Sequence, residues 1–177
     1  DVPIETCIKQ DLNRLNSVGK DVILKQYYDF ICTKEKPKYD SRKEDCILVD
    51  LDGTLAINNH NRSYFDASTC YRDDVCYEVL DILNVFSYKY KVIFLTGREE
   101  KYKEPTVKFL SNIGYLDNLL LMRTNGDSRK DYVIKEELYK TYIEPKFNVK
   151  FVLDDRNSVI RNCWNKLGLF VFKVGRE

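Results

Sequence analysis

Two carboxylates one residue apart, Asp50 and Asp52, directly follow the apolar run at residues 46–49. Alternate side chains of an extended chain point to the same side, so these two carboxylates can act together. Two close like charges raise one pKa or recruit a cation, and Mg²⁺ prefers carboxylate oxygens. One carboxylate can then attack as a nucleophile while the other transfers protons. An acidic turn that ends a strand is the alternative that Asp-x-Asp alone leaves open.

Two more polar groups follow apolar runs in the same way. Thr96-Gly97-Arg98 comes after residues 91–95, and Asp154-Asp155 comes after residues 149–153. A hydroxyl and backbone N–H groups between a strand and a helix suit a phosphate, although Thr96 could instead be a helix N-cap. Adjacent Asp residues could form a simple turn, but that turn would be costly if it packed near Asp50 without a cation.

The elements that must position these groups alternate between strands and helices. We expect strands at residues 46–49, 91–95, 119–122, 149–153 and 169–172. Helical patterns are expected at residues 73–90 and 100–112, after a cap at Asp127 or Ser128, and through residues 159–164. This alternation predicts an α/β fold with a doubly wound parallel sheet. The carboxyl ends of parallel strands lie at one edge, so the polar groups should converge there.

Residues 1–44 have a different pattern. Eight apolar residues recur at roughly helical spacing and predict one or two amphipathic helices that end before Lys36-Pro37: Leu12, Leu15, Val18, Val22, Ile23, Tyr27, Phe30 and Ile31. Gly19-Lys20 lacks the remainder of a phosphate-binding loop, so no kinase site is visible. We therefore expect a short N-terminal helical extension over residues 1–44 and a separate domain over residues 45–177.

Composition excludes few partners. There are 29 Lys and Arg against 28 Asp and Glu, so the net charge favours no nucleic-acid partner and excludes none. No apolar run is long enough to span a membrane. The six cysteines form no Cys-x-x-Cys pair, which indicates reduced thiols in an intracellular compartment. The single histidine, His60, is expected to be solvated, and a chain that begins with Asp is expected to be processed or a fragment.

The string Asp-Leu-Asp-Gly-Thr-Leu at residues 50–55 resembles the first motif of the haloacid dehalogenase (HAD) phosphotransferase superfamily. The resemblance implies that Asp50 is phosphorylated and that Asp52 is the general acid and base. Thr96 of the second motif would bind the phosphoryl group with Gly97. Asp154 and Asp155 resemble the fourth motif and would complete a Mg²⁺ site with the carboxylates of Asp50 and Asp52, Asp155 being the direct ligand.

The third motif of that superfamily is a lysine, and spacing alone leaves Lys130 and Lys135 open. Residues 126–137, and their continuation through residues 143–147 and 153–156, resemble the phosphatase domain of phage polynucleotide kinase/3′-phosphatase. This resemblance covers residues 45–177 and implies that Lys135 is the catalytic lysine. It also carries over four residues as substrate-binding: Arg62, Arg98, Arg129 and Asp131.

The resemblance implies a Mg²⁺-dependent 3′-phosphatase for RNA or DNA ends, with 2′,3′-cyclic phosphate as a further substrate. The gap at residues 56–70 is too short for a folded cap domain, so the site should be open to a polymer end. A nucleotidase or small-metabolite phosphatase, and a non-catalytic module that binds nucleic-acid ends, remain alternatives. Tyr64 and Phe65 either stack on a base or pack against the domain. A separate 5′-kinase or ligase partner, a homo-oligomer and a viral protein in the host cytoplasm stay open.

Overall fold

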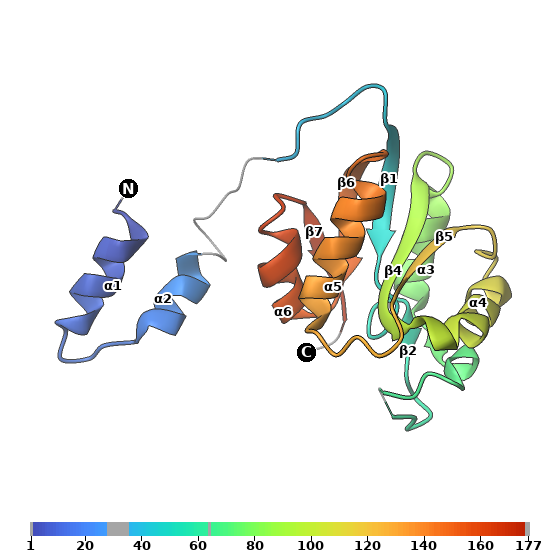
Figure 1. Cartoon of the computed structure of the whole chain (residues 1–177), viewed down its shortest axis with the longest axis horizontal. Helices are drawn as coiled ribbons and strands as arrows, with labels where there is room; N and C mark the ends of the chain where they lie inside the picture. Colours follow the sequence, from blue (N-terminus) through green and yellow to red (C-terminus); the bar gives the residue numbers. More distant parts are fainter. Residues whose placement is uncertain (1, 28–35, 64, 176–177) are drawn as a thin grey trace.

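The strand that precedes the first acidic pair, β1 (Glu44–Val49), lies at the centre of a five-stranded parallel sheet. The computed structural model describes residues 2–27, 36–63 and 65–175 (Figure 1). The strand order is β5-β4-β1-β6-β7, and the four outer strands are β4 (Lys91–Glu99), β5 (Leu119–Arg123), β6 (Phe147–Asp154) and β7 (Val171–Lys173). The predicted α/β fold with a doubly wound parallel sheet is confirmed.

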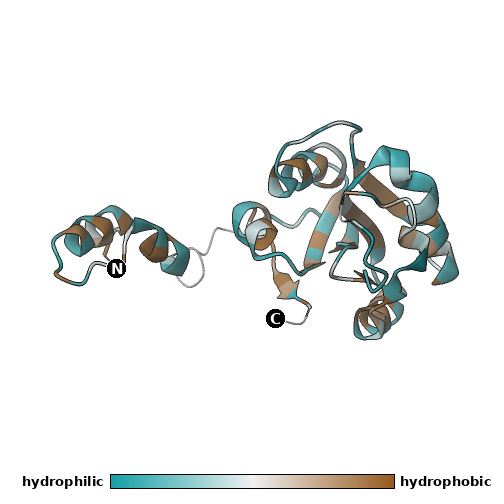
Figure 2. Ribbon diagram, turned by 90° about the horizontal axis from the view of Figure 1, so that it is seen from below, coloured by the Kyte–Doolittle hydropathy of each residue, from teal (hydrophilic) through white to brown (hydrophobic). Residues whose placement is uncertain are grey.

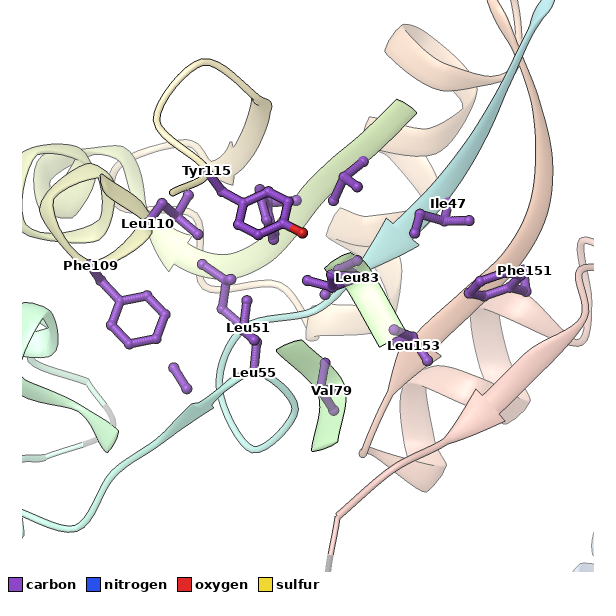
Figure 3. Close-up of a cluster of buried hydrophobic side chains, with 14 residues drawn as sticks. Ile47, Leu51, Leu55, Val79, Leu83, Phe109, Leu110, Tyr115, Phe151 and Leu153 are labelled. Atoms are coloured by element: carbon purple, nitrogen blue, oxygen red, sulfur yellow. The ribbon is translucent and has the colours of Figure 1, made fainter. Parts of the chain in front are cut away.

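Each face of the sheet is buried under helices. Ile47 and Val49 of β1 pack into a core with the helices α3 (Tyr77–Phe86) and α4 (Lys103–Asn112), and Figure 3 shows part of this cluster. Cys46 and Leu48 face the opposite core, under the segments α5 (Asp131–Leu138), η4 (Tyr139–Ile143), α6 (Asn157–Val159) and η5 (Ile160–Trp164). Much of the sheet is coloured hydrophobic in Figure 2, as expected for strands covered on both faces.

The chain changes direction across the sheet at β1. Strands β4 and β5 are added on one side of β1, and strands β6 and β7 on the other. In open α/β sheets the crevice at such a reversal, beyond the carboxyl ends of the strands, is where ligands bind. The turn that follows β1 carries Asp50 and Asp52, so these two residues lie at the reversal.

The segment between β1 and α3 forms no separate domain in the part that the structure describes. It contains a two-stranded antiparallel sheet, β2 (Ala56–Ile57) with β3 (Asp74–Val75), and the 3₁₀ turn η2 (Cys70–Arg72). The described residues of this segment therefore carry only a small two-stranded ladder. Tyr64 lies outside the described residues.

The N-terminal segment contains two helices, α1 (Ile4–Leu12) and α2 (Lys20–Gln26), which pack against each other (Figure 1). Asp11 joins them, because its carboxylate accepts hydrogen bonds from Ser17 Oγ (2.7 Å) and from the backbone N–H groups of Val18 (3.1 Å) and Gly19 (2.9 Å). The predicted helical contribution of Phe30 and Ile31 lies outside the described residues. Among the helices that the structure describes, none is long and apolar enough to cross a membrane.

The helical pattern expected at residues 100–112 is confirmed, because the 3₁₀ helix η3 (Glu100–Tyr102) leads directly into α4. Strand β4 continues to Glu99, so Thr96 is not a helix N-cap. The cap expected at Asp127 or Ser128 is wrong, because α5 begins at Asp131. The Asp127 carboxylate instead accepts a hydrogen bond of 2.9 Å from the Arg129 backbone N–H in the loop before α5.

Candidate active site

Asp50 lies against a lysine that is completely buried. The Lys135 ammonium, 0% exposed, donates hydrogen bonds to Asp50 Oδ1 at 2.6 Å and to Asp154 Oδ2 at 2.9 Å. Helix α5 supplies the lysine, and strands β1 and β6 end at the two carboxylates. Burial raises the pKa of Asp50 to about 8, and the opposing charge of Lys135 only limits that rise. A cation held beside Asp50 would lower this pKa further and favour the ionised form that a nucleophile requires.

Three carboxylates are arranged so that they could hold a cation. Oxygen atoms of Asp50, Asp154 and Asp155 all lie within 4.8 Å of one another. Burial and the adjacent Asp154 charge raise the pKa of Asp155, which a bound cation would reverse. Asp154 is already fixed by Lys135 and by the Trp164 indole N–H, which donates to Asp154 Oδ2 at 2.9 Å. This donor set fits a hard divalent ion such as Mg²⁺.

The turn after β1 brings the first and last of these carboxylates together. Gly53 has a φ of +86°, and a Cβ built at this position would lie 2.3 Å from Asp155 Oδ2. Only a residue without a side chain allows both the left-handed backbone and the approach of the Asp155 carboxylate. The glycine of the Asp-x-Asp-Gly string is thus required by the packing of the site.

Asp52 lies between two arginines and outside the three-carboxylate cluster. Its carboxylate accepts hydrogen bonds from Arg98 Nε (2.8 Å) and Nη2 (2.8 Å) and from Arg62 Nη2 (2.6 Å). Burial raises the pKa of Asp52, but the two arginines more than offset this effect and hold it below its usual value. These contacts do not support the prediction that the Asp52 carboxylate is a metal ligand.

Asp73 anchors both arginines and was missed by the sequence analysis. Its buried carboxylate accepts from Arg62 Nε (2.9 Å) and from Arg98 Nη2 (3.1 Å). Two carboxylates, Asp52 and Asp73, therefore share two guanidinium groups. Arg62 and Arg98 were predicted to bind substrate phosphate. The guanidinium N–H groups named here instead donate to Asp52 and Asp73 and orient Asp52. No motif signal marks Asp73, since it was expected only as the first residue of the helical pattern at residues 73–90.

The second-motif residues occupy the end of β4. Thr96 is buried, and its Oγ1 accepts a hydrogen bond of 3.2 Å from the Arg98 backbone N–H. The pairing of β4 with β5 shifts its register between Thr96 and Glu99. Strand β4 continues to Glu99, so Thr96 does not lie directly between a strand and a helix as the sequence predicted. A Cβ at Gly97 would lie 2.3 Å from Asp131 Oδ1, which makes Gly97 a point of close approach.

Asp131 pairs with cations on three elements. Its carboxylate lies 3.3 Å from Arg123 Nη2, 3.5 Å from Arg156 Nη1 and 3.8 Å from Lys135 Nζ. Arg123, also missed by the sequence analysis, donates to the Gly97 carbonyl at 2.8 Å and to the Arg129 carbonyl at 2.6 Å. As an anion Asp131 would repel a phosphate, so these contacts suit a positioning role better than the predicted substrate contact.

A cavity of about 540 Å³ opens over Asp50. Asp50, Asp52, Gly97 and Arg98 line it. Further cationic side chains contribute to its wall: Arg123, Arg129 and Arg156. Arg129 is exposed and is paired with Asp127 (2.6 Å) and Glu137 (2.8 Å). The exposed Lys130 does not line the cavity, whereas the buried Lys135 contacts Asp50.

Comparison with known protein families tests the predicted resemblance to polynucleotide kinase/phosphatases. Residues 44–177 match the model of the polynucleotide kinase PNKP phosphatase domain, a group of the HAD superfamily. The chain belongs to this family. The predicted resemblance to polynucleotide kinase/phosphatase enzymes is confirmed, and with it the assignment of the chain to the phosphatases.

Relatives of this PNKP-type phosphatase domain include a viral protein and proteins of known structure. A protein of Autographa californica nuclear polyhedrosis virus, to which bifunctional polynucleotide kinase/RNA ligase activity is attributed, is 30% identical over the whole chain. A chain of the solved Pnkp1/Rnl/Hen1 RNA repair complex is 35% identical over 99% of this chain, with a TM-score of 0.75. The class C acid phosphatase from Bacillus anthracis shares the fold alone, at 13% identity over 90% of this chain and 71% of its own, with a TM-score of 0.52.

The PNKP-type chain corresponds to only part of its relatives. It spans 27% of the viral protein and 63% of the chain in the RNA repair complex.

Proposed function

We propose that this chain is a Mg²⁺-dependent polynucleotide 3′-phosphatase that acts on RNA or DNA ends. The proposal rests on one observation above all. Asp50 lines an open cavity, contacts a buried lysine at 2.6 Å, and lies within 4.8 Å of two more carboxylates. The family of the domain and its RNA-repair and RNA-ligase relatives support a nucleic-acid substrate and favour RNA.

In the proposed mechanism, a carboxylate oxygen of Asp50 attacks phosphorus and the bond from phosphorus to the 3′-oxygen breaks. Asp52, which must carry a proton in the reacting complex although the two arginines favour its ionised form in the free chain, protonates the departing 3′-oxygen. Asp52 then takes a proton from the water that attacks the aspartyl-phosphate, which releases inorganic phosphate and restores Asp50. Lys135 balances the charge on Asp50, while Thr96 and the backbone at Gly97 lie at the strand end where phosphoryl oxygens would bind.

Mg²⁺, when held by Asp50 and Asp155 with Asp154 beside them, would neutralise charge on the transferred phosphoryl group. The open cavity and the absence of a cap domain from the described residues of the β1–α3 segment suit a polymer end. A 2′,3′-cyclic phosphate is proposed as a further substrate because the family resemblance implies it. A separate 5′-kinase or ligase is proposed as a partner because the viral relative combines those activities.

The deciding experiment measures phosphate release from an oligonucleotide that carries a 3′-phosphate, with and without Mg²⁺. Asp50→Asn and Asp52→Asn should each abolish release while the circular dichroism spectrum stays unchanged. Asp45→Asn is the matched control, because Asp45 lies near the other end of β1 and pairs with Lys150 at 3.4 Å. Near-normal release by Asp50→Asn would refute the mechanism.

Substrate class is decided by parallel rates on 3′-phosphate, 2′-phosphate and cyclic ends and on mononucleotides. Faster turnover of mononucleotides than of oligonucleotides would indicate a nucleotidase. Binding of 3′-phosphorylated ends without any turnover in Mg²⁺ would indicate a non-catalytic module.

A further inference from the structure

An aromatic ring stands exposed at the mouth of the active-site cavity. Phe65 is 90% exposed, yet it lines the same cavity as the two catalytic carboxylates, Asp50 and Asp52. Large apolar side chains are normally covered, and an exposed one beside a site is informative when it adjoins the groups that do chemistry. The exposed ring therefore has a position from which it can contact a bound substrate.

Hydrogen bonds hold the Phe65 backbone to its own loop and to the turn η3. The Phe65 backbone N–H donates to Ser63 Oγ at 3.2 Å, and the Tyr102 hydroxyl donates to the Phe65 carbonyl at 3.2 Å. Tyr102 belongs to the turn η3 that follows β4 and also lines the cavity. The Phe65 backbone is thus held next to η3, at the sheet edge where Asp50 lies, and the ring projects from it into solvent.

Phe65 is better placed than Tyr102 to accept a flat ligand. The Lys101 ammonium lies 5.0 Å from the centre of the Tyr102 ring, so one face of that ring already holds a cation. In the described segments no cation or aromatic ring is recorded against Phe65. The Phe65 ring is the apolar surface that remains available to a ligand in the cavity.

The remaining lining of the cavity specifies the chemistry of the ligand. Four arginines and five carboxylates line it, so a phosphate fits beside the arginines when a cation offsets the acidic groups: Arg98, Arg123, Arg129 and Arg156, with Asp50, Asp52, Glu99, Asp127 and Asp131. Its volume of about 540 Å³ falls within the roughly 300–1,000 Å³ of small-molecule sites and has room for about one nucleotide. A ligand with a phosphate at one end and a flat apolar group at the other fits both features.

We infer that Phe65 stacks on the base of the 3′-terminal nucleotide and thereby makes the phosphatase prefer nucleic-acid ends over other phosphate esters. This inference rests on the proposed function and adds a specificity-determining residue to it. Aromatic stacking contributes to affinity by a factor of about 5 to 150 per base and tolerates any sequence, because every base has a π-face. The preference should therefore depend on the presence of a base and little on its identity.

The test compares two oligonucleotides with a 3′-phosphate, one with a normal terminal nucleotide and one whose terminal residue is abasic. Dissociation constants are measured by fluorescence anisotropy in EDTA, and phosphate release is measured separately in Mg²⁺. Phe65→Ala, Phe65→Trp and the control Tyr88→Ala are compared with the natural chain. Tyr88 is 95% exposed but does not line the cavity.

Phe65→Ala should weaken binding of the base-bearing end about 10-fold and leave the abasic end unchanged, while Phe65→Trp restores the difference. Tyr88→Ala should change neither dissociation constant. Equal weakening on both oligonucleotides, no weakening at all, or no binding of either oligonucleotide by the natural chain would overturn the inference. Base-dependent binding without phosphate release in Mg²⁺ would support the stacking role and reject the proposed catalysis.

Discussion

At the scale of single residues, Lys135 is the cation that balances buried acidic charge at the site. It lies 2.6 Å from Asp50 and 2.9 Å from Asp154, and both Lys135 and Asp154 are completely buried. Removing one partner of a buried ion pair leaves an uncompensated charge in a medium of low dielectric constant. The stability of the domain and the ionisation of its nucleophile therefore depend on the same side chain.

Lys135→Met should destabilise the domain by about 3–5 kcal/mol, because two buried carboxylates lose their cation. Urea unfolding at pH 7 measures this free energy, and phosphate release should be lost as well. Lys140→Met is the control, since Lys140 is exposed and pairs only at the surface with Glu136. A cost below about 1 kcal/mol for Lys135→Met would show that the buried pair does not stabilise the fold as we argue.

The pH dependence of the unfolding free energy should show the effect of the two arginines on the ionisation of Asp52. The pKa of Asp52 is lower in the folded chain than its usual value. Such a group contributes stability above the unfolded pKa of about 3.9 and loses that contribution as the pH falls through the folded pKa. The difference in unfolding free energy between the natural chain and Asp52→Asn should stay constant above about pH 5 and shrink below about pH 4.

Urea unfolding over a pH series measures that difference, and Asp117→Asn serves as control because Asp117 is exposed. The control difference should remain small throughout. If the difference for Asp52→Asn instead grew as the pH fell, the arginines would not be stabilising an ionised Asp52.

The residue types of the site could be predicted from sequence only where they follow strands. Asp50, Asp52 and Asp154 directly follow apolar runs, so their convergence could be expected from the sheet alone. The choice of Lys135 over Lys130 needed the family resemblance, because both lysines lie near the start of a helical pattern. Asp73 could not be found, since its role depends on two arginines that reach it from other segments.

At the scale of elements, the turn after β1 determines whether Asp155 can reach the site. Gly53 and Gly114 both have a φ of +86°, but only a Cβ at Gly53 would meet a neighbour, Asp155 Oδ2 at 2.3 Å. The two glycines thus share a backbone requirement and differ in what surrounds them. Alanine at either position strains the backbone, but only alanine at Gly53 would also displace the Asp155 carboxylate, so comparing the two variants separates these effects.

Gly53→Ala should weaken Mg²⁺ binding by roughly 10- to 100-fold, the range found when the support of a metal ligand is disturbed. Both Gly53→Ala and Gly114→Ala should lose about 1 kcal/mol of stability or more, because alanine rarely adopts a positive φ. Calorimetric titration with Mg²⁺ and urea unfolding measure the two quantities. Equal Mg²⁺ affinities for the two variants would mean that Asp155 does not need the space at Gly53.

Element boundaries were harder to predict than the elements themselves. The five strands lie where apolar runs predicted them, although β6 begins earlier and β7 later than expected. The start of α5 was wrong because Asp127 and Ser128 are residue types that commonly cap helices but lie here in the loop before Asp131. The Asp127 carboxylate instead accepts a hydrogen bond within that loop, from the Arg129 backbone N–H at 2.9 Å.

At the scale of the whole molecule, the site depends on strand order. Asp50 and Asp154 meet because β1 and β6 are neighbours, although more than one hundred residues separate them in the chain. Periodicity predicts strands but does not order them, so the order β5-β4-β1-β6-β7 became known only from the structure. The family of the domain could be recognised because its motifs appear in sequence order at successive strand ends.

The fluorescence of the one tryptophan of the chain, Trp164, can report on metal binding at the site. Trp164 is buried and donates its indole N–H to the carboxylate that also holds Lys135. Because indole emission responds to nearby charge, titrating Mg²⁺ into the natural chain should shift the fluorescence spectrum, and Asp155→Asn should suppress the shift. A spectrum that stays constant while calorimetry registers bound Mg²⁺ would contradict this coupling. Metal occupancy could then be followed in real time without any added dye.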